Sequence, residues 1–159
     1  MYRYFPLCLA VTICLVLFGQ VPVRAEMKTA YIVANDETFR NLTGLCDYLK
    51  NGEIDVVQVK PTELDKVKGL EHYLVFGNPD DGDAIGKLIT ASLTPKQLEN
   101  AKRMGKTEVV IAPVDGANVM FFASSYSMKT FVQGSAAIWK EYFEGWYGIP
   151  LSVSQVIGY

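Results

Sequence analysis

An apolar stretch that runs directly into a polar loop places the strongest constraint on the fold of this 159-residue chain. Residues Tyr73–Phe76 are strand formers, and Gly77, Asn78 and Pro79 follow them at once. The central strand of a parallel sheet usually ends in this way, and open α/β sheets place their binding groups in such loops. We therefore expect residues 71–83 to contain the centre of the sheet and its functional edge.

Strand and helix patterns alternate before this stretch. Two short runs of strand formers, residues 30–34 and 55–60, flank a segment with an apolar period of three to four residues. This period predicts one helix, with Asp36 and Glu37 in its first turn and its end at Asn51-Gly52. A second, short helix is expected over residues 62–69, with Thr62 as its cap. Alternation at this spacing implies right-handed crossovers and a largely parallel sheet.

The pattern changes after the polar loop. A short helix is expected around residues 85–89, and Thr94 with Gln97 forms a capping box that starts another. Asp115-Gly116 between two apolar runs then predicts an antiparallel hairpin. Pro113 cannot donate to a ladder, which predicts that the first run of the hairpin lies at the edge of the sheet. The returning run is apolar on both faces and is expected inside the sheet.

These patterns together predict an α/β fold with three layers. The sheet is mixed and mostly parallel, with about five strands, a C-terminal antiparallel hairpin and helices on both faces. A last helix is expected over residues 128–146, capped by Ser124–Ser127. The predicted division is a signal peptide (1–25), a single α/β domain (26–150) and a tail or edge strand (151–159).

The first residues predict a secretory signal peptide. Arg3 precedes an apolar run, Leu7–Phe18, and short side chains lead to a cleavage point after Ala25. The run is shorter than the roughly 20 residues that a membrane-spanning helix needs. We therefore expect a secreted, periplasmic or cell-surface protein that contacts a membrane only through this segment if it stays uncleaved.

The charge balance and the number of cysteines limit the classes of function expected for the rest of the chain. Loss of Arg3 and Arg24 leaves 13 basic side chains against 17 acidic ones, a formal charge of −4. This balance disfavours binding to nucleic acid or to an anionic membrane. Only Cys46 remains after cleavage, so no internal disulfide is expected. A buried structural thiol is the favoured interpretation, and a reactive or intermolecular thiol is the alternative.

Two stretches together resemble a known family. LVFGN at residues 74–78 and NVMFFASSYSMKTFVQGSAA at residues 118–137 resemble the α/β domain of archaeal surface-layer proteins, and a related pattern occurs in the periplasmic subunit of bacterial cellulose synthase. The resemblance spans residues 73–139, about half the chain, and departs from the pattern at Phe76 and Ser124. It implies a non-catalytic envelope domain with a mixed three-layer α/β fold.

Polar side chains follow the first and third predicted strands. They are Asn35, Asp36, Glu37, Asn78, Asp80, Asp81 and Asp83. Parallel strands would bring these oxygens to one edge, where calcium or magnesium could bind, with Asp36, Asp80 and Asp83 as the candidate metal ligands. The favoured interpretation is that Asn78, Asp80 and Asp83 are turn and cap residues, because Asn-Pro and Asp-Gly are turn dipeptides and Asp83 precedes a helix.

Other candidate sites carry weaker signals. Ser124 and Ser125 could hold an anion through their amides at the start of the last helix, or simply cap it. His72 is the only histidine and begins the third strand, away from the functional edge, so we expect a surface or partly buried side chain. Asn41 begins a glycosylation sequon, which is used only if the host glycosylates.

Two functions from different classes remain. The preferred one is a secreted, non-enzymatic α/β domain that acts as a binding or assembly module of the cell envelope, with an envelope protein or another copy of itself as partner. The alternative is a small metal-dependent hydrolase or phosphoryl-handling enzyme that uses the acidic loops after the first and third strands.

Overall fold

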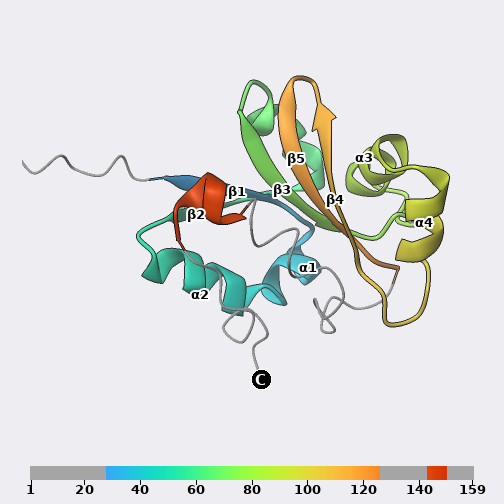
Figure 1. The fold of residues 1–159 in the computed structure, drawn as a ribbon, viewed down its shortest axis with the longest axis horizontal. Coiled ribbons are helices and arrows are strands. Elements are labelled where there is room, and N and C mark those ends of the chain that lie inside the picture. The colour runs from blue at the N-terminus through green and yellow to red at the C-terminus, as the bar shows by residue number, and fades with distance from the viewer. Residues whose placement is uncertain (1–27, 126–142, 150–159) are drawn as a thin grey trace, which may run out of the picture.

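The computed structural model describes residues 28–125 and 143–149 (Figure 1). The predicted signal peptide, most of the predicted last helix and the predicted tail or edge strand at residues 151–159 lie outside the described residues. Within the described ranges, every helix is too short or too polar to span a bilayer.

Ten elements precede the gap. They are β1 (Thr29–Val33), α1 (Asp36–Arg40), α2 (Thr43–Asn51), β2 (Asp55–Val59), the 3₁₀ helix η1 (Pro61–Val67), β3 (His72–Gly77), α3 (Ala84–Ser92), α4 (Pro95–Ala101), β4 (Glu108–Val114) and β5 (Ala117–Ala123). The sheet order is β2-β1-β3-β5-β4. Four strands are parallel and β4 is antiparallel to β5. The predicted mixed, mostly parallel α/β sheet is therefore confirmed.

Strand β3 lies at the centre of this sheet, as its sequence predicts. It pairs with β1 on one side and with β5 on the other. The register with β5 runs from His72↔Asn118 to Gly77↔Ala123. The side chains of Leu74, Val75 and Phe76 have no exposed surface, since helices cover both faces of the strand. A strand buried on both faces is expected to be a continuous apolar run.

Two hydrophobic cores lie on opposite faces of the sheet. One joins α2 and residues 143–147 to the face that carries Leu74, Phe76 and Phe122. The other joins η1, α3 and α4 to the face that carries Val75 and Phe121. Figure 1 shows α2 and the short helix at residues 143–147 on the side of the sheet away from α3 and α4. The three predicted layers are present.

The local signals for the hairpin and for α4 are also confirmed. Asp115 and Gly116 both have positive φ, 49° and 87°, as a two-residue hairpin turn of the favoured hand requires. Pro113 lies in β4, which is an edge strand. The Thr94 amide donates to Gln97 Oε1 at 2.8 Å, which forms half of the capping box.

The prediction of a single helix from Asp36 to Asn51 is wrong, because the chain forms two helices between these residues. The Asn41 amide is shared between the carbonyls of Glu37 and Thr38, which tightens the end of α1. The chain then turns at Leu42, so that α2 buries Leu45, Cys46 and Leu49. Asn41 is thus exposed in a turn between helices rather than inside one. Its glycosylation stays a prediction.

The next short helix also differs from its prediction. Thr62 was expected to cap it, but η1 begins one residue earlier, at Pro61. The Lys60 amide, just before η1, donates to the Glu63 carboxylate at 3.2 Å, so a contact of Glu63 marks the start of this helix. Pro61 suits the first position because it has no amide hydrogen to satisfy.

Truncation of the core should show how strongly the fold depends on contacts between β3 and β5. The rings of Phe76 and Phe122 stack with centroids 4.3 Å apart and planes 4° apart. We expect Phe122→Ala to lower the free energy of unfolding by about 3–5 kcal/mol, because the apolar area is lost and a cavity remains. Phe122→Leu, which keeps most of the volume, should cost clearly less. Urea denaturation of both variants measures the difference, and equal losses would contradict a packing origin.

Candidate functional site

The carboxyl ends of β1, β2, β3 and β5 meet at one edge of the sheet, called here the carboxyl edge. Because these four strands are parallel, the segments that follow them, residues 34–37, 60, 77–83 and 124–125, lie along this edge. The predicted convergence of the polar residues after the first and third strands on one edge is confirmed. Their hydrogen-bond partners decide what they can do there.

Asp36 connects the end of β1 to the end of β2. Its Oδ2 lies 2.9 Å from the Lys60 ammonium, and its Oδ1 accepts a 3.0 Å hydrogen bond from the Gln58 amide. The Lys60 hydrogen bond, followed by that of Gln58, lowers the pKa of the Asp36 carboxyl. Just before it, the Asn35 side chain accepts from the Thr38 amide at 2.8 Å and caps α1.

Asp80 performs the corresponding role on the other side of β3. Its Oδ2 accepts a 2.8 Å hydrogen bond from the Ser125 hydroxyl, which follows β5, and its Oδ1 pairs with Lys102 at the end of α4. Both contacts, the one with Lys102 first, lower the pKa of Asp80. Asn78 accepts from the Asp80 amide at 2.8 Å and closes a tight turn. Asp80 thus holds three segments together.

Asp83 and Asp81 complete this loop. Asp83 caps α3 by accepting a 2.8 Å hydrogen bond from the Gly86 amide. Burial raises the pKa of Asp81, and the nearby carboxylates of Asp83, Asp80 and Glu37 add to the rise. The carbonyl of Asp81 lies so close to Gly86 that a Cβ at that position would overlap it. Gly86 is therefore needed for the loop to pack on α3.

Ser124 and Ser125 are held by bonds of the same kind. The Ser124 hydroxyl donates to the Lys106 carbonyl at 2.9 Å, and its amide donates to the Gly77 carbonyl at 3.0 Å. The Ser125 amide donates to the Ala101 carbonyl at 2.9 Å. Both amides therefore already have acceptors, so this arrangement gives no support to an anion at these two residues. The helix they were expected to cap begins outside the described residues.

The candidate metal ligands serve separate purposes in this geometry. Asp36 pairs with Lys60, Asp80 pairs with Lys102, and Asp83 caps a helix. Throughout residues 28–125 and 143–149, no three histidine, cysteine, aspartate or glutamate side chains form a group that could hold a metal ion. The calcium or magnesium site, and the metal-dependent enzyme built on it, stay predictions without a supporting cluster in this part of the chain.

The partners that hold these acids could not be predicted from sequence patterns. Gln58 is 22 residues from Asp36, and Ser125 is 45 residues from Asp80. No local motif relates residues at such separations. Cys46, by contrast, is a free and buried thiol, as expected from its position on the apolar stripe, and burial raises its pKa.

His72 lies at the opposite edge, where the parallel strands begin, and is partly buried as predicted. Its ring stacks on Trp146, with centroids 4.9 Å apart and planes 26° apart, and meets the edge of Tyr147 at 5.6 Å. The buried Tyr147 hydroxyl has no hydrogen-bond partner among the described residues, and burial raises its pKa. His72 thus anchors the segment at residues 143–149 to the start of β3.

Comparisons of this chain with protein-family models, with curated proteins and with solved structures find no match. The resemblance to surface-layer proteins therefore stays a prediction.

Substitution of Gly86 should disrupt the polar loop. Alanine normally stabilises a helix relative to glycine by about 0.5–1 kcal/mol. We expect the opposite sign for Gly86→Ala, a loss of about 1–3 kcal/mol, because the new methyl group overlaps the Asp81 carbonyl. Gly82→Ala is the matched control in the same loop, since a Cβ there meets no atom within 4 Å. Thermal unfolding measures both, and a stabilised Gly86→Ala variant would refute the close packing.

Stability should depend on pH through His72. Burial lowers the pKa of His72 in the folded chain, whereas in the unfolded chain it is near the ordinary value of about 6.5. As the pH falls below that value, the unfolded chain takes up a proton first, so the free energy of unfolding decreases. We expect His72→Phe to weaken this decrease between about pH 7 and pH 5. At still lower pH, protonation of Asp36 and Asp80 should further decrease the free energy of unfolding, in the wild type and in His72→Phe alike, because the folded chain lowers the pKa of both carboxyls.

Urea titrations at several pH values measure this dependence. If the free energy of unfolding changes equally with pH in the wild type and in His72→Phe between neutral and mildly acidic pH, the partly buried His72 does not have the lowered pKa described above.

Proposed function

We propose that this chain is a secreted, non-enzymatic α/β domain that acts as an assembly module of the cell envelope, with copies associating through strand β2. The signal-peptide pattern and the resemblance to surface-layer proteins support the location. The geometry of the carboxyl edge supports a non-catalytic role, because the acids that would perform chemistry pair with Lys60 and Lys102 or cap a helix.

The open edge of β2 is the observation that carries the assembly proposal. Among the described residues, β2 pairs only with β1. The backbone amide of Asp55 donates to the Lys28 carbonyl, and the Val59 carbonyl accepts from the Ala34 amide. Every second residue from Asp55 to Val59 therefore directs its backbone N–H and C=O groups to β1. In a strand, the residues between them, Val56 and Gln58, direct their backbone N–H and C=O groups to the outside. In the part of the chain that the structure describes, no other strand pairs with these groups, so we propose that a further strand binds them.

The two outer strands of the sheet differ in how they are protected. Strand β4 contains Pro113, which has no amide hydrogen and discourages pairing at an edge. Strand β2 has no proline, and its central residues, Val56–Gln58, carry no charge. An uncharged edge strand is a template for another chain. The asymmetry favours association at β2 over association at β4.

A second copy of the same chain suits this edge. Two-fold symmetry places the two β2 strands antiparallel, with each copy using the same surface. The Lys60 ammonium of each copy is already paired with Asp36, so the outward backbone groups of Val56 and Gln58 carry the association. The continuous sheet across two copies is the proposed assembly unit.

Proline at position 58 tests this proposal. Gln58→Pro removes an outward-facing amide and fills the space a second strand needs, without removing a bond to β1. Gln58→Ala is the matched control, since both variants lose the side-chain bonds to Ala34 and Asp36. For the chain from residue 26 onward, we expect light scattering after size exclusion to show a dimer for the wild type and the alanine variant, and a monomer for the proline variant.

The proposal fails if the wild-type chain is monomeric at concentrations of about 100 μM, or if Gln58→Pro associates as well as Gln58→Ala. Circular dichroism of both variants confirms that the proline variant is folded before its oligomeric state is interpreted.

A further inference from the structure

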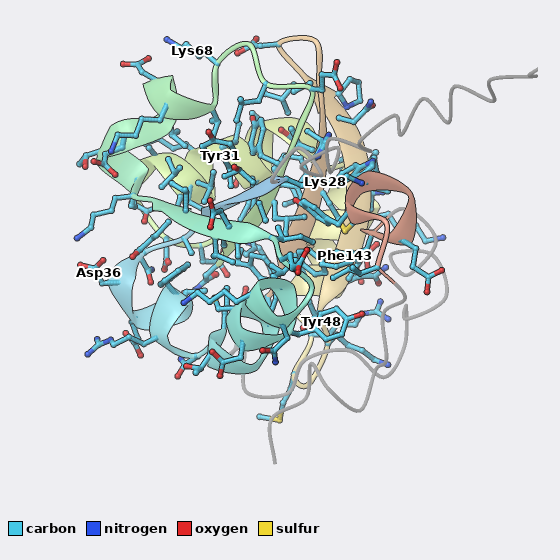
Figure 2. All side chains as sticks on the ribbon, turned by 90° about the vertical axis from the view of Figure 1, so that its left-hand side faces the viewer. Lys28, Tyr31, Asp36, Tyr48, Lys68 and Phe143 are labelled. Atoms are coloured by element: carbon cyan, nitrogen blue, oxygen red, sulfur yellow. The ribbon has the colours of Figure 1, made fainter. Side chains whose placement is uncertain are left out.

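A cavity lies at the edge of the sheet opposite the carboxyl edge, between η1, α3 and the turn that joins β4 to β5. Its volume is about 160 Å³. Tyr73, Val67 and Ala117 line it and are each only 4% exposed, and Leu64 and Leu88 add partly buried apolar surface. This cavity is separate from the carboxyl edge: Figure 2 shows Lys68, at its mouth, far from Asp36.

The size and lining of the cavity limit what can enter. A protein cavity of about 150 Å³ with apolar walls holds a ligand of the size of benzene. Leu64, Leu88 and Val114 come from three different elements, so the walls are apolar on several sides. By comparison with benzene, we expect a ligand whose apolar part is compact and has about six to eight non-hydrogen atoms.

The mouth of the cavity has an uneven charge. Lys68 and Asp115 both line it and are exposed. Lys68 is already paired with Asp65. Within the described part of the chain, the Asp115 carboxylate forms no hydrogen bond or salt bridge, and its charge acts on the Lys68 ammonium only at longer range, where it adds to the effect of Asp65 in raising the pKa of Lys68. The negative charge of Asp115 also reaches the buried Tyr73, where it adds to the effect of burial in raising the pKa of the phenol.

From these observations we infer that the cavity binds a small amphipathic amine, with its apolar body against Tyr73 and Leu88 and its ammonium group at Asp115. The positive charge of an ammonium group would be attracted to the Asp115 carboxylate, which forms no salt bridge among the described residues. A ligand with a carboxylate would be repelled by Asp115 and Asp65 and attracted by Lys68 alone. The hydroxyl of Tyr73 adds one polar group to a lining that is otherwise mostly apolar. This site is independent of association through β2.

Three probes of equal size test the charge preference. Benzylamine, benzyl alcohol and benzoate share one ring and differ in charge, and titration of the ¹⁵N-labelled protein followed by NMR reports where each binds. The amides of Gly69 and Gly116 lie at the mouth or in the adjacent turn and are the reporters. We expect localised shifts with benzylamine, and an affinity for it up to about fivefold above that for benzyl alcohol, as an exposed ion pair provides.

Two substitutions separate the charge from the cavity. Asp115→Asn should remove the advantage of the amine and leave the affinity for the alcohol unchanged. Asparagine tolerates the positive φ of this turn position, so the hairpin is retained. Leu64→Trp places a larger side chain at the wall of the cavity and should weaken the binding of both benzylamine and benzyl alcohol. A thermal melt shows whether this variant folds. If it does not fold, Asp115→Asn still tests the inference.

The inference is overturned if no probe shifts the reporters at tens of millimolar, if benzoate binds more tightly than benzylamine, or if Asp115→Asn leaves the ratio of amine to alcohol affinity unchanged. Preferential binding of benzoate would assign the mouth to Lys68 instead.

Discussion

The parallel pairing of β3 with β5 is the contact on which the other features depend. Both strands are buried on both faces, so their backbone groups must find partners within the sheet. Six residue pairs, from His72↔Asn118 to Gly77↔Ala123, provide them. The same register sets the separation of the loops that follow, and so places the Ser125 hydroxyl 2.8 Å from Asp80. On one face, the pairing also brings Phe76 against Phe122.

The polar residues of the carboxyl edge act as connections between loops. An exposed ion pair such as Asp36 with Lys60 is screened by solvent and contributes little to stability, so these contacts do not hold the fold together by their energy. They fix the positions of segments that the sheet has already brought close. The features that we propose bind a partner or a ligand are different ones, the outer side of β2 and the cavity near Asp115.

Local signals predicted the elements well. Asp115-Gly116 predicted the hairpin, Thr94 and Gln97 predicted the start of α4, and an apolar run predicted the central strand, because each of these depends on residues a few positions apart. The break at Asn41 was missed because the apolar period continues through it, while the shared hydrogen bonds of that amide leave no trace in the period. The partners of Asp36 and Asp80, and the stacking of His72 on Trp146, depend on segments distant in the sequence.

The sequence by itself determined the class of fold, the order of its elements and the edge at which the acidic loops meet, since hydrophobic periodicity and turn chemistry act over short distances. Only the tertiary structure decided what those acids contact, which strands lie at the two sides of the sheet among the described residues, and where apolar walls enclose a cavity. Each of these depends on the register and packing of segments far apart in the chain. For that reason the strand and loop at residues 71–83 are the centre of the fold, while the proposed binding surfaces lie elsewhere.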